Sequence, residues 1–454
     1  MKILLLSPPL LLPKEPYAAL PALKAFVEQH GHEAVLKDIS VEFFDRVLSS
    51  DYLKKEYRKI RNKLNELSLK KILSDDEKTN RRTLKALFAS LPYLIRHIDH
   101  AKILIKNKNK AKESILAKIR GLWGLLVLVA GLEVIKLSNL STVLTFLGFR
   151  TKYSVNSSDE ILKAVNDENN NLFINFFKEY VISGISAENP GLIGISINDY
   201  NQIIPGLTLA KLIKNEGIYV VIGGVIFSKE LMIKEGLFNL CDSFIVGDGE
   251  FALLELIKQL ESSENNFHRV PNLAWFNKEN KRVIFNDVIN VKDLDVLPTP
   301  NYDGINIDSY FNLYPYYFSF PLTISKGCYW NKCGFCDIVY NKEYRERSIN
   351  LIIKDIVTII NKYKVRSFFL TGESLRPQQL NDLASALIEN KLNIKWQGYA
   401  RAEKEFTKEF CELLSASGCT RLSIGLESGS QRILNLMNKG LELSTFEDAI
   451  RNLS

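Results

Sequence analysis

Cysteine is scarce in this sequence, with six residues in a chain of 454. So few cysteines do not make a disulfide framework for a chain of this length. The opening apolar run, residues 3–6, is too short for a secretory signal, and Pro8 and Pro9 follow where a cleavage site needs small residues. We therefore expect a cytoplasmic protein whose cysteines stay reduced.

Long apolar runs are also lacking. The longest candidate, residues 121–132, has twelve residues and is followed at once by Glu133. A transmembrane helix needs about 20 apolar residues. We therefore expect this segment to form a buried helix.

One segment contains far fewer acidic than basic residues. Residues 54–120 contain twenty Lys and Arg against seven Asp and Glu, whereas the whole chain has a net charge of only +7. This local excess gives no support for a nucleic-acid partner of the whole protein. Apolar residues at intervals of three and four predict helices with a solvated face. An anionic membrane or an acidic partner is the alternative, which leaves membrane association open.

Continuous apolar runs alternate with helical patterns over residues 1–285. This alternation predicts an α/β domain with a Rossmann-like (flavodoxin-like) parallel sheet. The basic helical segment interrupts it as an insertion at about residues 50–180, and later helices are expected around 205–215 and 228–235. The expected strands are residues 2–7, 33–40, 191–197, 218–224 and 243–250.

Small and polar residues follow the expected strands. In open parallel sheets, ligands bind beyond the carboxyl ends of the strands, and small residues there let a bulky ligand approach the backbone. A turn that needs a positive φ is the alternative explanation for any single glycine. The candidate binding residues are Pro8, Pro9, Ser196, Asn198, Gly223, Gly224, Gly247, Asp248, Gly249 and Glu250.

In combination, the segments PYAALPALKAFVEQHGHEAVLKDIS, IGISI, VVIGGVIFS and VGDGEFALLELI resemble the cobalamin-binding domain at the front of many radical S-adenosylmethionine (SAM) enzymes. The resemblance implies that cobalamin binds at the strand ends. Other cobalamin proteins bind cobalt from below through a histidine in an Asp-x-His-x-x-Gly motif, and none of the five histidines here has that context. Radical enzymes generally lack this ligand, and so does a domain that has lost the cofactor, so its absence does not discriminate.

Residues 286–320 are rich in proline and aromatic residues, including Pro298, Pro300 and Pro315. This composition predicts an extended linker that is held against the protein surface. A second domain is expected over residues 321–454.

Half of the cysteines lie within nine residues of the second domain, at Cys328, Cys333 and Cys336. Structural zinc is one interpretation, but it needs four ligands, and the next cysteines, Cys411 and Cys419, lie about 80 residues further on. Three thiolates instead hold an iron–sulfur cluster with one iron left open. We interpret Cys411 and Cys419 as packing residues.

The stretch GCYWNKCGFCD resembles the cluster motif of the radical SAM superfamily, in a variant with one more residue between the first two cysteines than the usual C-x3-C-x2-C. The resemblance implies a [4Fe–4S] cluster on Cys328, Cys333 and Cys336, with SAM chelated at the open iron. An electron from a reductant such as flavodoxin or ferredoxin then cleaves SAM, and the resulting 5′-deoxyadenosyl radical abstracts hydrogen from an unactivated carbon.

Residues 321–325 are expected to form a strand, with the cysteine loop just after it. Three further expected strands, residues 366–374, 394–401 and 420–428, end in polar residues, as in a (β/α) barrel with its chemistry at that end. The alternatives are helix caps and surface ion pairs, such as Arg401 with Glu403. The resemblance implies SAM contacts of three kinds, to its ammonium, carboxylate and ribose groups. The residues are Gly372 and Glu373 for the ammonium, Arg401 for the carboxylate, and Glu427 and Ser428 for the ribose.

The second domain supplies about four β/α units, whereas the barrel of the family has six or more. A partial radical SAM barrel is therefore expected. A fragment, a separate polypeptide that completes the barrel, and a degenerate relative are the three explanations.

Two cofactor domains in one chain predict a division of labour. The favoured hypothesis is a cobalamin-dependent radical SAM methyltransferase acting on an unactivated carbon of a natural product, peptide, lipid or tetrapyrrole. A ring-forming or rearranging radical SAM enzyme is the first alternative. A non-catalytic fragment or subunit that binds an iron–sulfur cluster or a corrinoid is the second.

Overall fold

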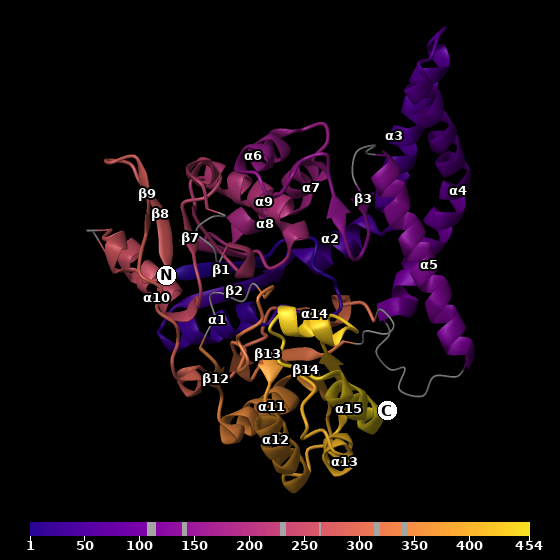
Figure 1. Ribbon diagram of the computed structural model, residues 1–454. Coiled ribbons are helices and arrows are strands. Elements are labelled where there is room, and N and C mark those ends of the chain that lie inside the picture. Colours follow the sequence, from indigo (N-terminus) through magenta and orange to yellow (C-terminus); the bar gives the residue numbers. More distant parts are fainter. Residues whose placement is uncertain (107–114, 139–142, 228–232, 263–264, 313–317, 337–342) are drawn as a thin grey trace.

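The computed structural model describes residues 1–106, 115–138, 143–227, 233–262, 265–312, 318–336 and 343–454. Its main body contains two sheets, one in each half of the chain, and a group of long helices projects from one side (Figure 1). The expected helix around residues 228–235 and the expected linker residue Pro315 lie wholly or largely outside the described residues.

The first sheet has the strand order β2-β1-β5-β6-β7-β8-β9. Its first five strands are parallel, and their order is that of flavodoxin-like domains. The predicted fold class is confirmed, but the antiparallel hairpin β8–β9 was not expected from the sequence. The strands are β1 Lys2–Ser7, β2 Glu33–Asp38, β5 Leu192–Ser196, β6 Tyr219–Gly223, β7 Ser243–Ile245, β8 Leu273–Asn277 and β9 Arg282–Phe285.

Helices cover both faces of this sheet. Successive residues of β1 point to opposite faces, so that Ile3 and Leu5 pack in one buried cluster and Leu4 and Leu6 in another. This two-sided burial explains why β1 is apolar at consecutive positions. The first cluster contains residues of α1 Ala19–Gln29 and α10 Glu250–Glu261, and the second contains residues of α2 Ile39–Val47, α6 Ser158–Asn166, α7 Leu172–Tyr180, α8 Ile182–Ala187 and α9 Ile203–Asn215.

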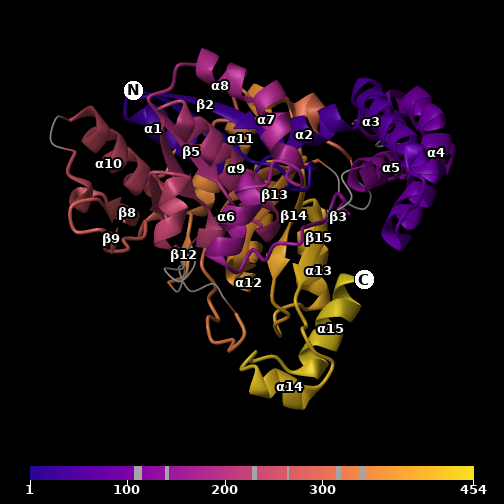
Figure 2. The same ribbon diagram turned by 90° about the horizontal axis from the view of Figure 1, so that it is seen from above.

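Three long helices form the part that stands out in Figure 1, and we call it the projection. It consists of α3 Ser50–Leu69, α4 Asp75–Lys106 and α5 Ile115–Ser138. Figure 2 shows it at one end of the molecule, beside α2. The short strands β3 Val143–Leu144 and β4 Phe149–Arg150 follow it, and α6 and α7 return to pack against α9.

The expectation of a buried helix at residues 121–132 is wrong for one face of α5. Leu128 and Leu132 are buried there, but Leu122 and Leu126 are exposed. Residues Lys118–Ser138 are also long and apolar enough to cross a membrane, by length and composition. The continuous apolar sequence therefore hides a helix with one packed face and one open face.

The linker is held between the two halves of the chain. Tyr302 is buried and stacks on Phe320, with ring centroids 4.2 Å apart. Tyr310 is also buried, and its hydroxyl donates a hydrogen bond of 2.6 Å to Asp38 at the end of β2. These contacts tie the linker to both domains.

The second sheet is parallel throughout, in the order β10-β13-β14-β15. These are the strands that the sequence predicts, and the predicted domain limits of 285, 320 and 454 stay predictions. The strands are β10 Phe320–Thr323, β13 Ser367–Leu375, β14 Lys395–Ala400 and β15 Cys419–Ile424, with a small antiparallel pair β11 Ser325–Lys326 and β12 Arg345–Glu346. The helices are α11 Ile349–Tyr363, α12 Pro377–Glu389, α13 Lys408–Ala416, α14 Gln431–Leu436 and α15 Leu443–Leu453.

Candidate active site

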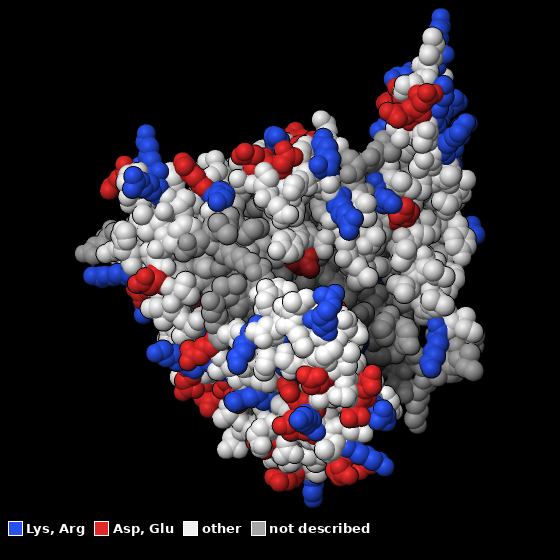
Figure 3. Space-filling view, viewed as in Figure 1, with Lys and Arg blue, Asp and Glu red and all other residues white. Residues whose placement is uncertain are grey.

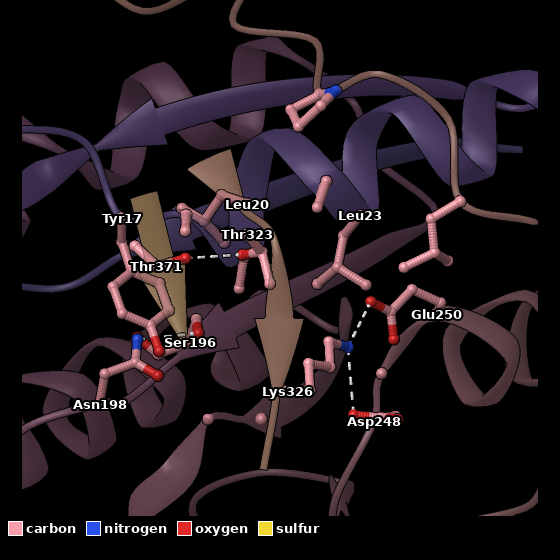
Figure 4. Close-up of a pocket in the computed structure, with 18 of the residues that line it drawn as sticks. Tyr17, Leu20, Leu23, Ser196, Asn198, Asp248, Glu250, Thr323, Lys326 and Thr371 are labelled. Carbon is pink, nitrogen blue, oxygen red and sulfur yellow. Dashed lines mark hydrogen bonds and ion pairs between the residues drawn. The ribbon is translucent and has the colours of Figure 1, made fainter. Parts of the chain in front are cut away.

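A cavity of about 530 Å³ lies between the two domains. Figure 4 shows side chains from both halves of the chain around it, including Ser196 and Asn198 of the first domain and Thr323 and Thr371 of the second. Ten of the residues predicted from strand ends line this cavity. They are Ser196, Asn198, Gly223, Gly224, Gly247, Asp248, Gly249, Glu250, Gly372 and Glu373.

The remaining predicted residues lie outside the lining of this cavity. Pro8 is at the end of β1, where its carbonyl accepts a hydrogen bond of 2.7 Å from Gln202. Pro9 follows it in the chain. The cysteine loop and the other residues proposed to contact SAM belong to the second domain. The residues that do not line the cavity are Pro8, Pro9, Cys328, Cys333, Cys336, Arg401, Glu427 and Ser428.

A buried cluster of ion pairs closes one side of the cavity (Figure 4). Lys326 lies 3.1 Å from an oxygen of Asp248 and 2.9 Å from an oxygen of Glu250. Arg345 donates to the other oxygen of Asp248 at 2.6 Å. The carboxylates that follow β7 in the first domain are therefore bound to two cations of the second domain.

The electrostatics of this cluster favour its charged form. Burial acts to raise the pKa of Asp248, but Lys326 and Arg345 outweigh it and hold that pKa below its usual value. Burial likewise acts to lower the pKa of Lys326, and Glu250 and Asp248 outweigh it and keep that pKa raised. The two domains are therefore joined by a charged network at neutral pH.

Two lining atoms of the first domain are buried acceptors that a ligand would satisfy. Within the described chain, Oδ1 of Asn198 and Oε2 of Glu250 are buried and accept no hydrogen bond. Buried polar atoms are nearly always hydrogen-bonded in folded proteins. The edge of the cavity near these atoms therefore suits a ligand with polar groups.

Several lining residues were not predicted from the sequence. Tyr17 is half-buried, and desolvation, with the nearby charge of Glu373, raises its pKa to about 12. Phe369 and Tyr399 come from the second sheet, with ring centroids 5.4 Å apart. Lys326 had a usable signal, since it directly follows a predicted strand, whereas the segment before α1 gave none for Tyr17.

Gly372 belongs to β13, where a side chain would not fit. A Cβ at this position would collide with the hydroxyl of Ser325 and would lie 2.9 Å from Leu375. The glycine thus allows β13 and the segment before the cysteines to approach each other closely. Cys328 forms a parallel bridge with Ser374, next to the same contact.

The loop with the three cysteines is held by the segment that follows α14. Gly334 donates its backbone N–H to the carbonyl of Met437 at 2.8 Å. The indole of Trp330 donates to the carbonyl of Asn438, also at 2.8 Å. Gly440 has a φ of 60° and no room for a Cβ, because the same indole occupies that space. The loop is therefore fixed at several points.

The three thiols are neighbours but do not converge. Burial raises the pKa of Cys333; the thiols of Cys336 and Cys328 also raise it, and Lys439 and Arg401 act in the opposite direction. Among the described residues, no three His, Cys, Asp or Glu side chains lie close enough to hold a metal ion directly. The donor set itself, three thiols on one loop near two cations, fits an anionic iron–sulfur cluster.

Arg401 lies beside this loop, with its guanidinium 4.7 Å from the ring centre of Trp330. It forms an ion pair of 3.0 Å with Glu403, which is the alternative that the sequence left open, and donates to the carbonyls of Lys439 and Gly440.

Glu427 and Ser428 follow β15 and have local partners. Glu427 has a φ of 69° and lies 3.2 Å from Lys439. The hydroxyl of Ser428 accepts a hydrogen bond of 3.2 Å from the backbone of Ser430. Their predicted contacts to SAM stay predictions.

Comparison with known proteins places this site in a family. Residues 322–454 match the radical SAM superfamily. An uncharacterised methyltransferase of Pyrococcus horikoshii is 27% identical over 277 residues, which cover 59% of this chain and 58% of that protein. The bacteriochlorophyllide d C-12(1)-methyltransferase of Chlorobaculum tepidum is 34% identical over 140 residues, which cover 29% of this chain and 30% of that protein.

Among solved structures, the radical SAM methyltransferase TsrM from Kitasatospora setae, with cobalamin and a [4Fe–4S] cluster bound, has a similar fold. The two structures match with a TM-score of 0.54 at 14% sequence identity. The match covers 99% of this chain and 66% of the TsrM chain. This chain thus spans less than two thirds of the length of each of these proteins. Residues 322–454 are thus a radical SAM domain, and they follow a flavodoxin-like parallel-sheet domain in a chain whose fold is similar to that of TsrM.

Proposed function

We propose that this protein is a cobalamin-dependent radical SAM enzyme that methylates an unactivated carbon. The observation that carries the proposal is the cavity between the domains. Its lining includes the glycine-rich strand ends of the first domain together with Gly372 and Glu373 of the radical SAM domain. A methyl group carried on one side and a substrate activated on the other need such a shared space. The names of two relatives and the ligands of the similar structure support it.

The residues present suit both cofactors. Cys328, Cys333 and Cys336 would hold a [4Fe–4S] cluster, and the charges of Lys439 and Arg401 partly offset the burial that raises the pKa of Cys333. When bound, the cluster supplies the electron that cleaves SAM. Glu373 lines the cavity, and its carboxylate would meet the ammonium group of SAM.

The strand ends of the first domain would hold cobalamin. Gly223, Gly224 and Gly247 present backbone without side chains to the cavity, and Ser196 and Asn198 add polar groups there. We also propose that a reductant such as flavodoxin or ferredoxin supplies the electron and that the protein is cytoplasmic. The proposed substrate is a natural product, peptide, lipid or tetrapyrrole.

The test is anaerobic reconstitution of the protein with iron and sulfide, followed by two measurements. The first is formation of 5′-deoxyadenosine from SAM in the presence of a reductant, with Cys328→Ala as the inactive control. The second is transfer of the labelled methyl group of SAM to added reduced cobalamin. We expect both in the wild-type protein and no 5′-deoxyadenosine in the variant.

The other outcomes separate the alternatives. Cleavage of SAM without methyl transfer would favour a ring-forming or rearranging enzyme. Protein that holds iron but shows neither reaction would favour the non-catalytic alternative. Protein that holds no iron after reconstitution would refute the whole assignment of the cysteine loop.

A further inference from the structure

The projection carries an apolar face that the described part of the chain leaves open. Four residues of α5 form it at helical spacings of three and four, which places them on one side of the helix. The exposed fractions are 57% for Ile119, 59% for Leu122, 60% for Leu126 and 48% for Val129. We call these four residues the α5 face.

The orientation of α5 is fixed by tight packing on its other side. A Cβ at Gly124 would lie 3.2 Å from the carbonyl of Ala101, and one at Gly131 would lie 3.0 Å from Ile98. Val127, Leu128, Leu132 and Ile135 are buried on this packed side. Only 39% of the most apolar 18-residue stretch of α5 is buried. The exposed apolar residues therefore form a continuous patch, which is less common on a protein surface than a single exposed leucine.

Two basic residues border this face at one end. Lys118 and Arg120 are exposed and flank Ile119. The segment 54–120 has twenty basic against seven acidic residues. In Figure 3 both basic and acidic side chains lie near the tip of the projection, whereas the surface over α5 is largely uncharged. An apolar strip bordered by basic residues is typical of helices that lie on anionic lipid surfaces.

Two aromatic residues lie beside the strip. Tyr93 of α4 is exposed, and its hydroxyl accepts a hydrogen bond of 3.2 Å from the indole of Trp123 on α5. Tyr and Trp are favoured at the boundary between lipid and water, since each has an apolar ring and a polar tip.

We propose that the α5 face docks on an anionic lipid bilayer, with α5 lying in the plane of the membrane surface. A spanning orientation would strip α5 from α4, against which its other face is packed. A second copy of the chain is the less suitable occupant, because two projections with the same basic excess would repel each other. Anionic lipid supplies both the apolar layer and the opposite charge.

The experiment is co-sedimentation of the full chain with vesicles at 0.1 M salt. One set of vesicles contains phosphatidylcholine alone, and the other contains phosphatidylcholine with 30% phosphatidylglycerol. We expect binding to the anionic vesicles only, with release at 0.5 M salt. The double variant Leu122→Glu, Leu126→Glu should lower the partition coefficient by about tenfold or more, because it places two carboxylates in the apolar layer.

The matched control is the double variant Ile289→Glu, Ile388→Glu. Both residues are exposed apolar side chains outside the projection, at 59% and 41%. It should bind like the wild type, and circular dichroism checks that both variants are folded.

Three results would overturn the proposal. The first is wild-type protein that stays in the supernatant or binds no better than the Leu122→Glu, Leu126→Glu variant. The second is a dimer in sedimentation equilibrium that only this variant dissociates, without vesicle binding. The third is bound protein that resists alkaline carbonate, which would mean that α5 spans the bilayer. None of these outcomes depends on the proposed enzyme activity.

Discussion

The substitution Asp248→Asn tests whether the buried ion pairs hold the two domains together. The carboxylate accepts hydrogen bonds from Arg345 at 2.6 Å, from the backbone of Val291 at 2.8 Å and from Lys326 at 3.1 Å. An amide of the same size keeps one acceptor and turns the other into a donor, which then faces a donor. Because the exposed fractions of the Asp248 and Arg345 side chains are only 6% and 3%, water does not replace the lost partner.

We expect the variant to lose about 3–5 kcal/mol in free energy of unfolding, the range for breaking a buried pair from one side. Urea denaturation followed by tryptophan fluorescence measures the loss at pH 7. The matched control is Asp448→Asn, which breaks the exposed pair with Arg451 and should cost less than about 1 kcal/mol. Equal losses in the two variants would refute the structural role of the cluster.

The pH dependence provides a second check. The folded-state pKa of Asp248 is lowered, so its contribution is fully present above the unfolded value of about 3.9 and is lost as the pH falls through the folded value. The stability difference between wild type and Asp248→Asn should therefore be the same at pH 7 and pH 6 and should shrink only below about pH 4. A difference that already declines between pH 7 and pH 6 would mean that another group is responsible.

Two further predictions concern the second domain and the thiols. Gly372→Ala should lower the free energy of unfolding by about 1–3 kcal/mol, because the new methyl group meets Ser325, and Ser325→Gly in the same chain should restore most of the loss in urea denaturation. In iron-free native protein at pH 8, a maleimide should label the exposed Cys336 first and leave Cys241 unlabelled, because Cys241 is buried and burial raises the pKa of its thiol. Peptide mapping that finds Cys241 labelled as fast as Cys336 would contradict this structure.

The sequence predicted the parallel strands well because buried strands of this kind are apolar at consecutive positions. The segments at β1, β5 and β6 have this form and lie in the middle of the first sheet. The same signal failed for α5, where an equally continuous apolar run has one open face. Composition states how apolar a helix is, but only its packing partners decide which side is covered.

The sequence predicted those site residues whose place follows from a nearby strand. It did not predict contacts that form only when the two domains pack against each other. Gly372 and Glu373 follow from their place in a strand. The pairing of Asp248 with Lys326 joins residues 78 positions apart, and neither charge specifies its partner. Asp248 and Glu250 line the cavity, as their place after a strand led us to expect, but the sequence did not indicate that their carboxylates also bind cations of the other domain.

The short segment from Ser325 to Cys328 has a mechanical consequence for the enzyme. Ser325 packs against Gly372, Lys326 is bound to the other domain, and Cys328 pairs with Ser374. A hinge motion that separated the two domains would therefore move Cys328 relative to Cys333 and Cys336. Any mutation that loosens the contact between the domains should therefore also disturb the position of the cysteine loop.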